Sequence, residues 1–244
     1  MRRVVVYPDR IAVEAADIPA PGPNEALVRT LVAGVCGSDL HAARGSHPFV
    51  PLPYRPGHEV VGVIETAGSA ARVAPGQRVI VEPDLPCWTC KMCTTGRENL
   101  CENLQFFGCG YAQGGMADYF TVAANRLHPV PDVLDDHAAA LIEPLSTPVH
   151  AVRLAGDVAG RSVAVLGAGT IGLLTLAVLR AHGAGTVVWA CSGASTTKSQ
   201  AFAGLSLIGV PGFEPGTSCP PDIYSGLAGC VAEWREVPNV QVNP

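Results

Sequence analysis

Four cysteines gathered in one short stretch constrain this chain more than any other feature of its sequence. Their spacing is C-x2-C-x2-C-x7-C, at Cys87, Cys90, Cys93 and Cys101. Two-residue spacers let neighbouring thiolates converge on a single ion, and a closed shell of four cysteines is typical of structural zinc. The loop that they enclose is too polar to form a core, so a bound ion would supply its folding energy. The alternatives are four unrelated buried cysteines and an iron–sulfur cluster, although the spacing differs from that of the common ferredoxin motifs.

Composition places the chain among folded proteins of one or two domains. Of its 244 residues, 48% are apolar and only 15% are charged, well below the usual charged share of about 25%. Its 16 Lys and Arg residues against 21 Asp and Glu residues leave a net charge of -5. The chain has no basic block that could neutralise a row of phosphates. We therefore expect no nucleic-acid partner.

Two apolar stretches bear on membrane insertion and secretion. The apolar run near the N-terminus stops at Pro8, short of the roughly 7 to 15 apolar residues of a signal peptide. The longest uncharged apolar stretch, Val163 to Leu179, is broken by glycines in its first half, which favours a strand, a turn and a buried helix over a membrane span. The sequence thus predicts a cytoplasmic protein without a membrane partner, whose cysteines bind metal rather than form disulfides.

Up to about residue 130, the chain consists of short β-branched runs separated by Pro and Gly, which is typical of an all-β barrel or sandwich. The expected strands are Arg3 to Val6, Ala26 to Ala33, Glu59 to Thr66, Arg78 to Glu82 and Ala117 to Val122. Two helices should follow. The first runs from Asp135 to Glu143, where Pro144 should end it, and the second from about Ser146 to Leu154.

The pattern then changes to alternating strand and helix. A buried strand from Ser162 to Leu166 leads into a glycine turn, an apolar helix from Leu173 to Ala181 and a second strand from Thr186 to Trp189. This order makes one β-α-β unit of the parallel, dinucleotide-binding kind. Beyond it, no helical or alternating period persists, and disorder is one interpretation of this atypical tail. The expected organisation is a β domain over 1–150, a partial dinucleotide-binding domain over 151–191 and the tail over 192–244.

The turn between the first strand and the helix has the spacing G-x-G-x-x-G, at Gly167, Gly169 and Gly172. Because this motif follows a strand and opens a helix, it predicts a pyrophosphate site. The first glycine makes the turn, the second lets the backbone approach the pyrophosphate, and the third lets helix and strand pack closely. With the intervening Thr170 and Ile171, these glycines are the candidate cofactor-binding residues. A plain glycine turn is the alternative.

A second set of metal-ligand types is dispersed along the chain, at Cys36, His58, Glu59 and Glu143. Each residue alone has an ordinary explanation as a core cysteine, part of a turn or a charge at a helix end. Together they supply one thiolate, one imidazole and two carboxylates, which suits an open catalytic zinc that keeps a position for water or substrate. Cys109 and His47 belong to no motif, and we expect them in the core and in a loop.

In their order and approximate spacing, these motifs resemble those of the medium-chain zinc-dependent alcohol dehydrogenases. The shared segments are Cys36-Gly-Ser-Asp-Leu-His41, Gly57-His-Glu59, the four-cysteine stretch, Leu141-Ile-Glu-Pro-Leu145 and the glycine turn. Ser38 and the Glu143-Pro144 pair are most similar to the branch of sorbitol, other polyol, 2,3-butanediol and threonine dehydrogenases. The resemblance covers about residues 1–190. It implies a GroES-like catalytic β-barrel followed by a Rossmann domain, with zinc in the barrel and NAD or NADP as cofactor.

The resemblance also implies a metal ligand at each matching position. Cys36 and His58 would bind a catalytic zinc, with Glu59 and Glu143 as alternative carboxylate ligands or as partners through water. The zinc would act as a Lewis acid on the oxygen of a small alcohol or polyol, and the carbon-bound hydride would pass to the nicotinamide.

Ser38 and His41 resemble the proton relay that links the buried site of this family to solvent. A helix cap at Ser38 and an exposed helical His41 are the alternative. Asp39 is expected to be a supporting or structural carboxylate.

The chain departs from this family in the cofactor domain. An acidic residue should follow the second strand and bind the ribose 2′-OH, but no Asp or Glu occurs between Asp157 and Glu214. A six-stranded Rossmann domain needs on the order of 150 residues, and 84 remain from Arg161 onward. We expect family sequence to end near Val188 to Cys191, by frameshift, truncation or fusion. The family implies a homo-oligomer, and the shortened cofactor domain argues against one in this chain.

Three functions are therefore compatible with the sequence. The first is a zinc- and NAD(P)-dependent oxidoreductase that acts on a secondary alcohol or polyol. The second is a remnant that binds zinc without catalysis. The third is an interaction protein that uses an exposed apolar half-domain.

Overall fold

The computed structural model describes residues 1–167, 169–190, 206–207 and 240–242, and the chain divides into two compact units, 1–143 and 144–244. The boundary follows Glu143, inside the stretch that the sequence assigns to the first domain. The expected domain limits at 150 and 191 stay predictions, since most of the tail lies outside the described residues. In the part of the chain that is described, no helix has both the length and the apolar character to cross a membrane.

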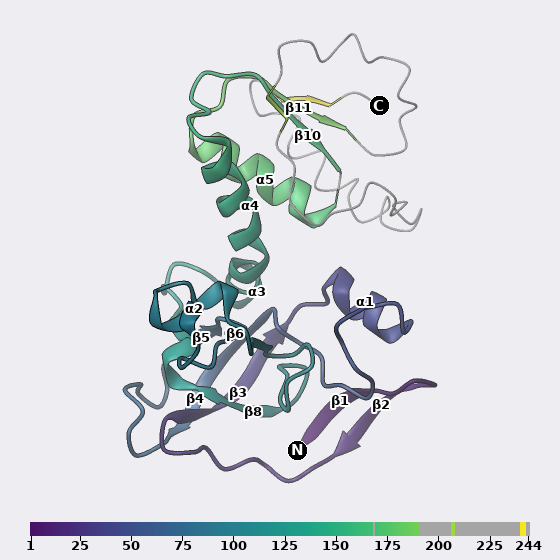
Figure 1. The fold of residues 1–244 in the computed structure, drawn as a ribbon, viewed down its shortest axis with the longest axis vertical. Coiled ribbons are helices and arrows are strands. Elements are labelled where there is room, and N and C mark those ends of the chain that lie inside the picture. Colours follow the sequence, from purple (N-terminus) through teal and green to yellow (C-terminus); the bar gives the residue numbers. More distant parts are fainter. Residues whose placement is uncertain (168, 191–205, 208–239, 243–244) are drawn as a thin grey trace. The chain divides into compact units, whose positions relative to one another are not determined.

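The first unit is built mainly of β-strands (Figure 1), which confirms the all-β expectation. Its strands are Arg2–Val6 (β1), Ile11–Ala15 (β2), Glu25–Ala33 (β3), Val60–Ala67 (β4), Arg78–Val81 (β5), Asp84–Leu85 (β6), Gln105–Phe106 (β7), Tyr119–Ala123 (β8) and Leu127–Pro129 (β9). Five of them form an antiparallel sheet in the order β8-β3-β4-β5-β9. Strands β1 and β2 form a hairpin, and β6 pairs with β7.

Short helical segments interrupt and follow these strands. They are Gly37–Ala43 (α1), Lys91–Thr94 (α2), Glu98–Leu100 (η1), Ala124–Arg126 (η2) and Asp136–Ala140 (α3). Helix α1 follows β3 directly and carries the Cys36 motif at its start, whereas α2 and η1 belong to the four-cysteine stretch. The functional motifs of this unit therefore lie in the connections between strands.

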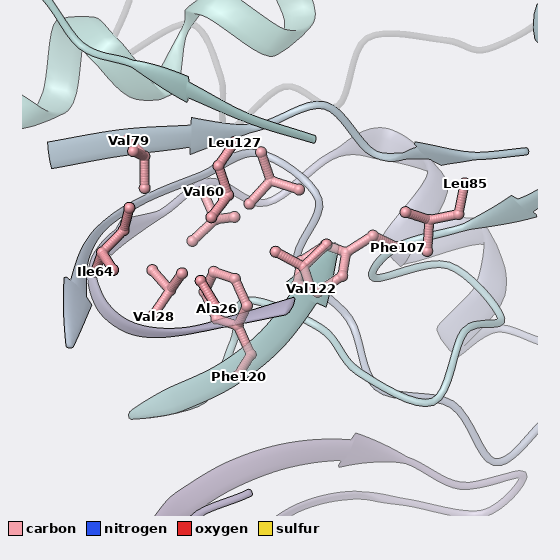
Figure 2. Close-up of a cluster of buried hydrophobic side chains, with 11 residues drawn as sticks. Ala26, Val28, Val60, Ile64, Val79, Leu85, Phe107, Phe120, Val122 and Leu127 are labelled. Atoms are coloured by element: carbon pink, nitrogen blue, oxygen red, sulfur yellow. The ribbon is translucent and has the colours of Figure 1, made fainter. Parts of the chain in front are cut away.

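Alternating side chains place two apolar clusters around the main sheet. Ala26 and Val28 of β3, which are fully buried, pack with Phe120 of β8 and Val60 of β4 in the larger cluster. Figure 2 shows these side chains pointing into one shared space. The next residue of β4, Val61, belongs instead to a second cluster with apolar residues of α3. Because successive residues of a strand face opposite sides, apolar residues on both faces of β4 are buried.

The two predicted helices after residue 130 differ from the structure in one respect. Helix α3 ends at Ala140, and helix α4, Ile142–Ala155, begins almost at once and contains Pro144 and Pro148. The expectation that Pro144 ends a helix is therefore wrong. Pro144 lies in the first turn of α4, where a backbone N–H has no helical acceptor, so its missing donor costs little.

The second unit contains the predicted β-α-β element. Its segments are Val163–Leu166 (β10), Thr170–Ala181 (α5) and Val187–Ala190 (β11), with short strands at Ser206–Leu207 (β12) and Val240–Val242 (β13). These strands pair with one another in parallel, in the order β12-β10-β11-β13. The core of this unit joins residues of β10, β11 and α5 to Val152 of α4. The parallel, helix-linked strands confirm the expected architecture, and β12 and β13 add strands from a tail for which the sequence predicts no fold.

Candidate functional site

The four cysteines of the predicted structural zinc site converge in the first unit. Their sulfur atoms all lie within 4.8 Å of one another. The Sγ of Cys90 lies 3.5 Å from that of Cys93 and 3.9 Å from that of Cys101. Four sulfurs held tetrahedrally at about 2.3 Å from one zinc ion would lie about 3.8 Å apart. The arrangement therefore fits a closed, four-coordinate zinc site.

Backbone N–H groups are directed at these sulfurs. The N–H of Cys90 donates to the Sγ of Cys87 at 3.4 Å, and the N–H groups of Cys87 and Asn103 donate to the Sγ of Cys101 at 3.2 and 3.3 Å. The turn that makes this possible includes Trp88, which has a left-handed φ of 55°. Such donors favour thiolate over thiol. Hydrogen bonds from Thr89 lower the pKa of Cys87 to about 5, and backbone hydrogen bonds lower the pKa of Cys90, whereas burial raises the pKa of Cys93 to about 12. Cys87 and Cys90 are therefore the thiols that ionise most readily at this site.

The stretch from 87 to 101, which we call the cysteine lobe, has almost no apolar core. Its only buried residues are Cys93 and Cys101. A buried arginine outside the lobe provides its main charged contact, because the guanidinium of Arg126 donates to Glu82 and to Glu98, each at 2.5 Å. The same guanidinium lies 5.1 Å from the ring centre of Trp88. No local spacing in the sequence indicates this role of Arg126, since its partners are 44 and 28 positions away in the chain.

A second group of ligand types forms where β3 ends and β4 begins. One ligand atom each of Cys36, His58 and Glu59 lies within 4.8 Å of the others. The strand pairing explains the convergence, because the N–H of Gly34 donates to the backbone carbonyl of Glu59 at 2.7 Å. A β-carbon at Gly34 would lie only 2.3 Å from Oε2 of Glu59. The Glu59 carboxylate therefore occupies space that any other residue at position 34 would fill. We call this group the barrel site.

The imidazole of His58 is buried and incompletely paired. His58 is only 4% exposed, and the Nδ1 of its ring has no hydrogen-bond partner among the described residues. Buried polar atoms are nearly always paired, so the ring has unused binding capacity, as expected of a side chain that takes a metal. Phe106 packs edge-on at 5.5 Å. A β-carbon at Gly108 would lie 2.8 Å from the backbone nitrogen of His58, so glycines far along the chain also hold this residue in place.

Asp39 fixes the backbone that carries Cys36. Its carboxylate accepts a hydrogen bond from the Cys36 N–H at 3.0 Å and another from the Tyr54 hydroxyl at 3.3 Å. It is 7% exposed, in agreement with the structural role expected of it. Burial raises the pKa of the Cys36 thiol, and hydrogen bonding with Ser38 opposes that rise. The raised pKa therefore favours the protonated thiol of Cys36, and a bound cation would favour the thiolate.

The two predicted relay residues both lie on α1. Cys36, not Ser38, is the N-cap of this helix, so the alternative of Ser38 as the cap does not hold. Ser38 is half-buried near the Cys36 thiol, whereas His41 is exposed. The pair therefore extends from the barrel site toward solvent, and the relay itself stays a prediction.

Glu143 lies outside the close group formed by Cys36, His58 and Glu59. Burial raises its pKa to about 7, and the charges of Glu59 and Asp84 add to the rise whereas His58 opposes it. The charges of the barrel site therefore influence the pKa of Glu143, although Glu143 lies outside the close group of ligand atoms. Its role as an alternative ligand stays a prediction.

Of the two residues without a motif, His47 lies in a loop as expected, and Cys109 is only partly buried at the edge of the core. Cys109 packs against an apolar cluster around Tyr54, and burial raises its pKa to about 11. His47 lies in the loop after α1, where its Nδ1 accepts a hydrogen bond from the backbone N–H of Phe49 at 3.3 Å.

In the second unit, the glycine turn has the geometry that its motif predicts. Gly167 has a φ of 121°, and Gly169 is the N-cap of α5. A β-carbon at Gly172 would lie 1.9 Å from the carbonyl oxygen of Gly167, whereas one at Gly169 would meet nothing within 4 Å. The open approach at Gly169 therefore suits a pyrophosphate. Of the intervening candidates, Thr170 is exposed and Ile171 half-buried.

Comparison with known proteins places these features in a family. Residues 22–132 match the family described as alcohol dehydrogenase GroES-like domain. The chain is 41% identical over 182 residues to L-galactonate-5-dehydrogenase of Escherichia coli K12, covering 74% of this chain and 53% of that protein. It is 35% identical over 237 residues to sorbitol dehydrogenase of Ovis aries, covering 96% of this chain and 66% of that protein.

A solved structure also matches this chain. An NADP-bound protein of Sinorhizobium meliloti 1021, described as a zinc-binding dehydrogenase, superposes with a TM-score of 0.74 at 38% identity, covering 84% of this chain and 60% of that one. The chain therefore spans between about half and two thirds of the length of these proteins.

Proposed function

Because this chain belongs to the zinc-dependent medium-chain alcohol dehydrogenase family, we propose that it serves the oxidation of a secondary alcohol or polyol with NAD or NADP. The observation that carries the proposal is the convergence of Cys36, His58 and Glu59 at one site of the β unit. This group has three donors, fewer than the closed set of the cysteine lobe. A site with a free position suits substrate binding, whereas a closed shell suits a structural role.

Each zinc site has its own set of ligands in this proposal. Cys87, Cys90, Cys93 and Cys101 would hold a structural ion, and Cys36, His58 and a carboxylate of Glu59 or Glu143 would hold a catalytic ion. When bound there, zinc supplies Lewis-acid chemistry that lowers the pKa of a substrate hydroxyl. One thiolate and one carboxylate would balance the charge of the divalent ion. Asp39, which accepts a hydrogen bond from the backbone N–H of Cys36, would keep that thiolate in place.

The remaining steps belong to the chain's own residues. Oxidation of an alcohol to a carbonyl releases one hydride and one proton. The Ser38 hydroxyl, half-buried near Cys36, would accept the proton, and the exposed His41 imidazole would release it to solvent. The backbone around Gly169 and the N-terminus of α5 would hold the pyrophosphate of the dinucleotide, which supplies the hydride acceptor when bound.

Small vicinal diols and polyols are the substrates that this proposal favours, with a hydroxy amino acid as a further candidate. Support comes from the names of the relatives, which act on L-galactonate and sorbitol. A zinc site beside a carboxylate and a serine also suits a hydroxyl-rich substrate. Oxidation of long-chain primary alcohols alone would contradict this assignment.

One observation favours a second candidate, a zinc protein without catalysis. No Asp or Glu occurs between Asp157 and Glu214, so the ribose lacks the acidic partner typical of this fold. Each charge-assisted hydrogen bond contributes roughly 1.5 to 3 kcal/mol, and losing two of them would weaken dinucleotide binding at least about a hundredfold. Hydride transfer would then fail for want of positioning.

The test combines metal analysis with a substrate panel. We expect two zinc ions per chain after refolding in zinc-containing buffer, and slow reduction of NAD or NADP that depends on sorbitol or 2,3-butanediol. Two zinc ions without polyol-dependent reduction would favour the non-catalytic candidate. Absence of zinc after refolding would contradict both candidates.

A further inference from the structure

Trp189 makes a contact that the glycine motif does not require. It lies on β11 opposite Val165 of β10, in the core of the second unit, and is 9% exposed. Its indole Nε1–H donates to the carbonyl oxygen of Gly167 at 3.0 Å. A rigid, buried aromatic side chain on the second strand therefore holds the first glycine of the turn between the first strand and the helix.

Three groups meet at this carbonyl. Gly167 adopts a left-handed φ of 121°, which turns the chain from β10 toward α5. A β-carbon at Gly172 would lie 1.9 Å from the Gly167 oxygen and 3.3 Å from Nε1 of Trp189. The first turn of α5, the indole and the carbonyl thus fit against one another with no spare room. A change in any one of them would shift the direction of the turn.

We propose that Trp189 is a positioning residue for the dinucleotide. By holding the Gly167 carbonyl, the indole N–H fixes the orientation in which Gly169 and the N-terminus of α5 face the pyrophosphate. This inference rests on the proposed function, because it assumes that the turn binds NAD or NADP. The turn matters more for dinucleotide binding in this chain, because no acidic residue follows β11 directly to hold the ribose.

A role of Trp189 in positioning the turn predicts which ligands should be affected. Trp189 acts through the turn, so its loss should weaken ligands that contain a pyrophosphate and leave adenosine unaffected. A merely structural tryptophan would behave differently, because loosening of the core would weaken both ligands together. The comparison of NADH with adenosine therefore separates positioning from packing.

Trp189→Phe is the test variant, because it keeps an aromatic ring and removes the donor. Phe49→Leu is the control, since Phe49 lies in the loop after α1, is 85% exposed and belongs to neither metal group. We expect Trp189→Phe to bind NADH about three- to tenfold more weakly than the unchanged protein, with adenosine affinity and the thermal midpoint unchanged. Calorimetry or ligand-observed NMR at millimolar concentrations would give the affinities.

Two results would overturn this inference and leave the proposed function standing. Equal NADH affinity of Trp189→Phe and the unchanged protein would show that the hydrogen bond does not matter. Equal weakening of NADH and adenosine binding in Trp189→Phe would assign Trp189 to packing. If the unchanged protein binds no NADH at all, the cofactor part of the proposed function fails with it.

A measurement on the unchanged protein covers the case in which Trp189→Phe does not fold. With 15N-labelled tryptophan, the indole N–H signals can be assigned by replacing the other tryptophans one at a time. We expect the Trp189 signal to exchange slowly with D2O and to shift when NADH is added. Fast exchange, or no shift at NADH saturation, would overturn the proposal.

Discussion

The two candidate zinc sites lie in the same unit of the chain, but they are held by different means. The cysteine lobe buries only Cys93 and Cys101, and hydrogen bonds to sulfur direct its backbone. The barrel site lies at the ends of two long paired strands, β3 and β4, whose side chains fill the main apolar clusters. One site has little to hold it except its ligands, whereas the other sits on a structure that has its own core.

This difference indicates what each ion would do for the protein. Metal binding to a site that is unformed in the unfolded chain contributes directly to folding. The lobe should therefore depend on its ion for structure. The barrel site is already shaped by strand register, by Gly34 and by Asp39, so its ion should contribute chemistry more than stability.

The largest expected effect is that of Cys90→Ser. The lobe should lose its ion and unfold locally, because structural zinc sites contribute on the order of 10 kcal/mol to folding. Metal analysis should then find one zinc per chain instead of two, and limited proteolysis should cut within the lobe. Cys109→Ser is the control, since Cys109 belongs to neither metal group. Retention of both ions by Cys90→Ser would contradict the closed-site assignment.

Cys36→Ser should remove one ion with a much smaller effect on the fold. We expect one zinc per chain, loss of any polyol-dependent reduction, and a thermal midpoint within about 5 °C of the unchanged protein, since effects of about 1 kcal/mol shift midpoints by only a few degrees. Circular dichroism and metal analysis would check both points. If Cys36→Ser unfolds the β unit, the contrast between the two sites is lost.

Arg126→Gln tests the contact between the lobe and the strands. Arg126 is 9% exposed, while its partners Glu82 and Glu98 are 40% and 44% exposed. Because the carboxylates can recover water, we expect a loss of about 2 kcal/mol in the free energy of unfolding, less than for a fully buried pair. Guanidinium denaturation would measure it. An unchanged midpoint would mean that the zinc ion alone holds the lobe.

Gly34→Ala should disturb the barrel site without touching the lobe. The new β-carbon would lie 2.3 Å from Oε2 of Glu59, so the carboxylate must move. Disturbed partners of metal ligands typically cost 10- to 100-fold in affinity, and we expect about tenfold weaker zinc binding at this site. Gly37→Ala is the matched control, because a β-carbon there meets nothing within 4 Å. Equal zinc affinities of the two variants would show that Glu59 is not a ligand.

The smallest effect is expected at the surface of the β unit. Arg2 and Asp118 form an exposed ion pair at 3.0 Å, and hydrogen bonds from Arg2 lower the pKa of Asp118 below its ordinary 3.8. A lowered carboxyl pKa stabilises the fold above that ordinary value, and the stabilisation is lost as the pH falls through the lowered pKa. Arg2→Gln should therefore reduce the thermal midpoint slightly at pH 7 and not at all in strong acid. A difference that persists in acid would exclude this ion pair as its cause.

The sequence by itself determined the features that depend on short spacing. Cys87, Cys90 and Cys93 lie so close in the chain that connectivity alone brings their sulfurs near one another. The same holds for Gly167, Gly169 and Gly172, whose spacing fits one turn between a strand and a helix. The β-branched runs also predicted the main strands, because period-2 burial leaves a direct pattern in the residues.

Only the tertiary structure decided which distant residues meet. The register of β3 with β4 brings Cys36 beside Glu59, and it leaves Glu143 outside their close group. Pro144 lies inside a helix because α4 restarts just before it. The contacts of Arg126 with Glu98 and of Trp189 with Gly167 join residues 28 and 22 positions apart. Such pairs depend on strand order and on which side chains are buried together, and no local spacing encodes either.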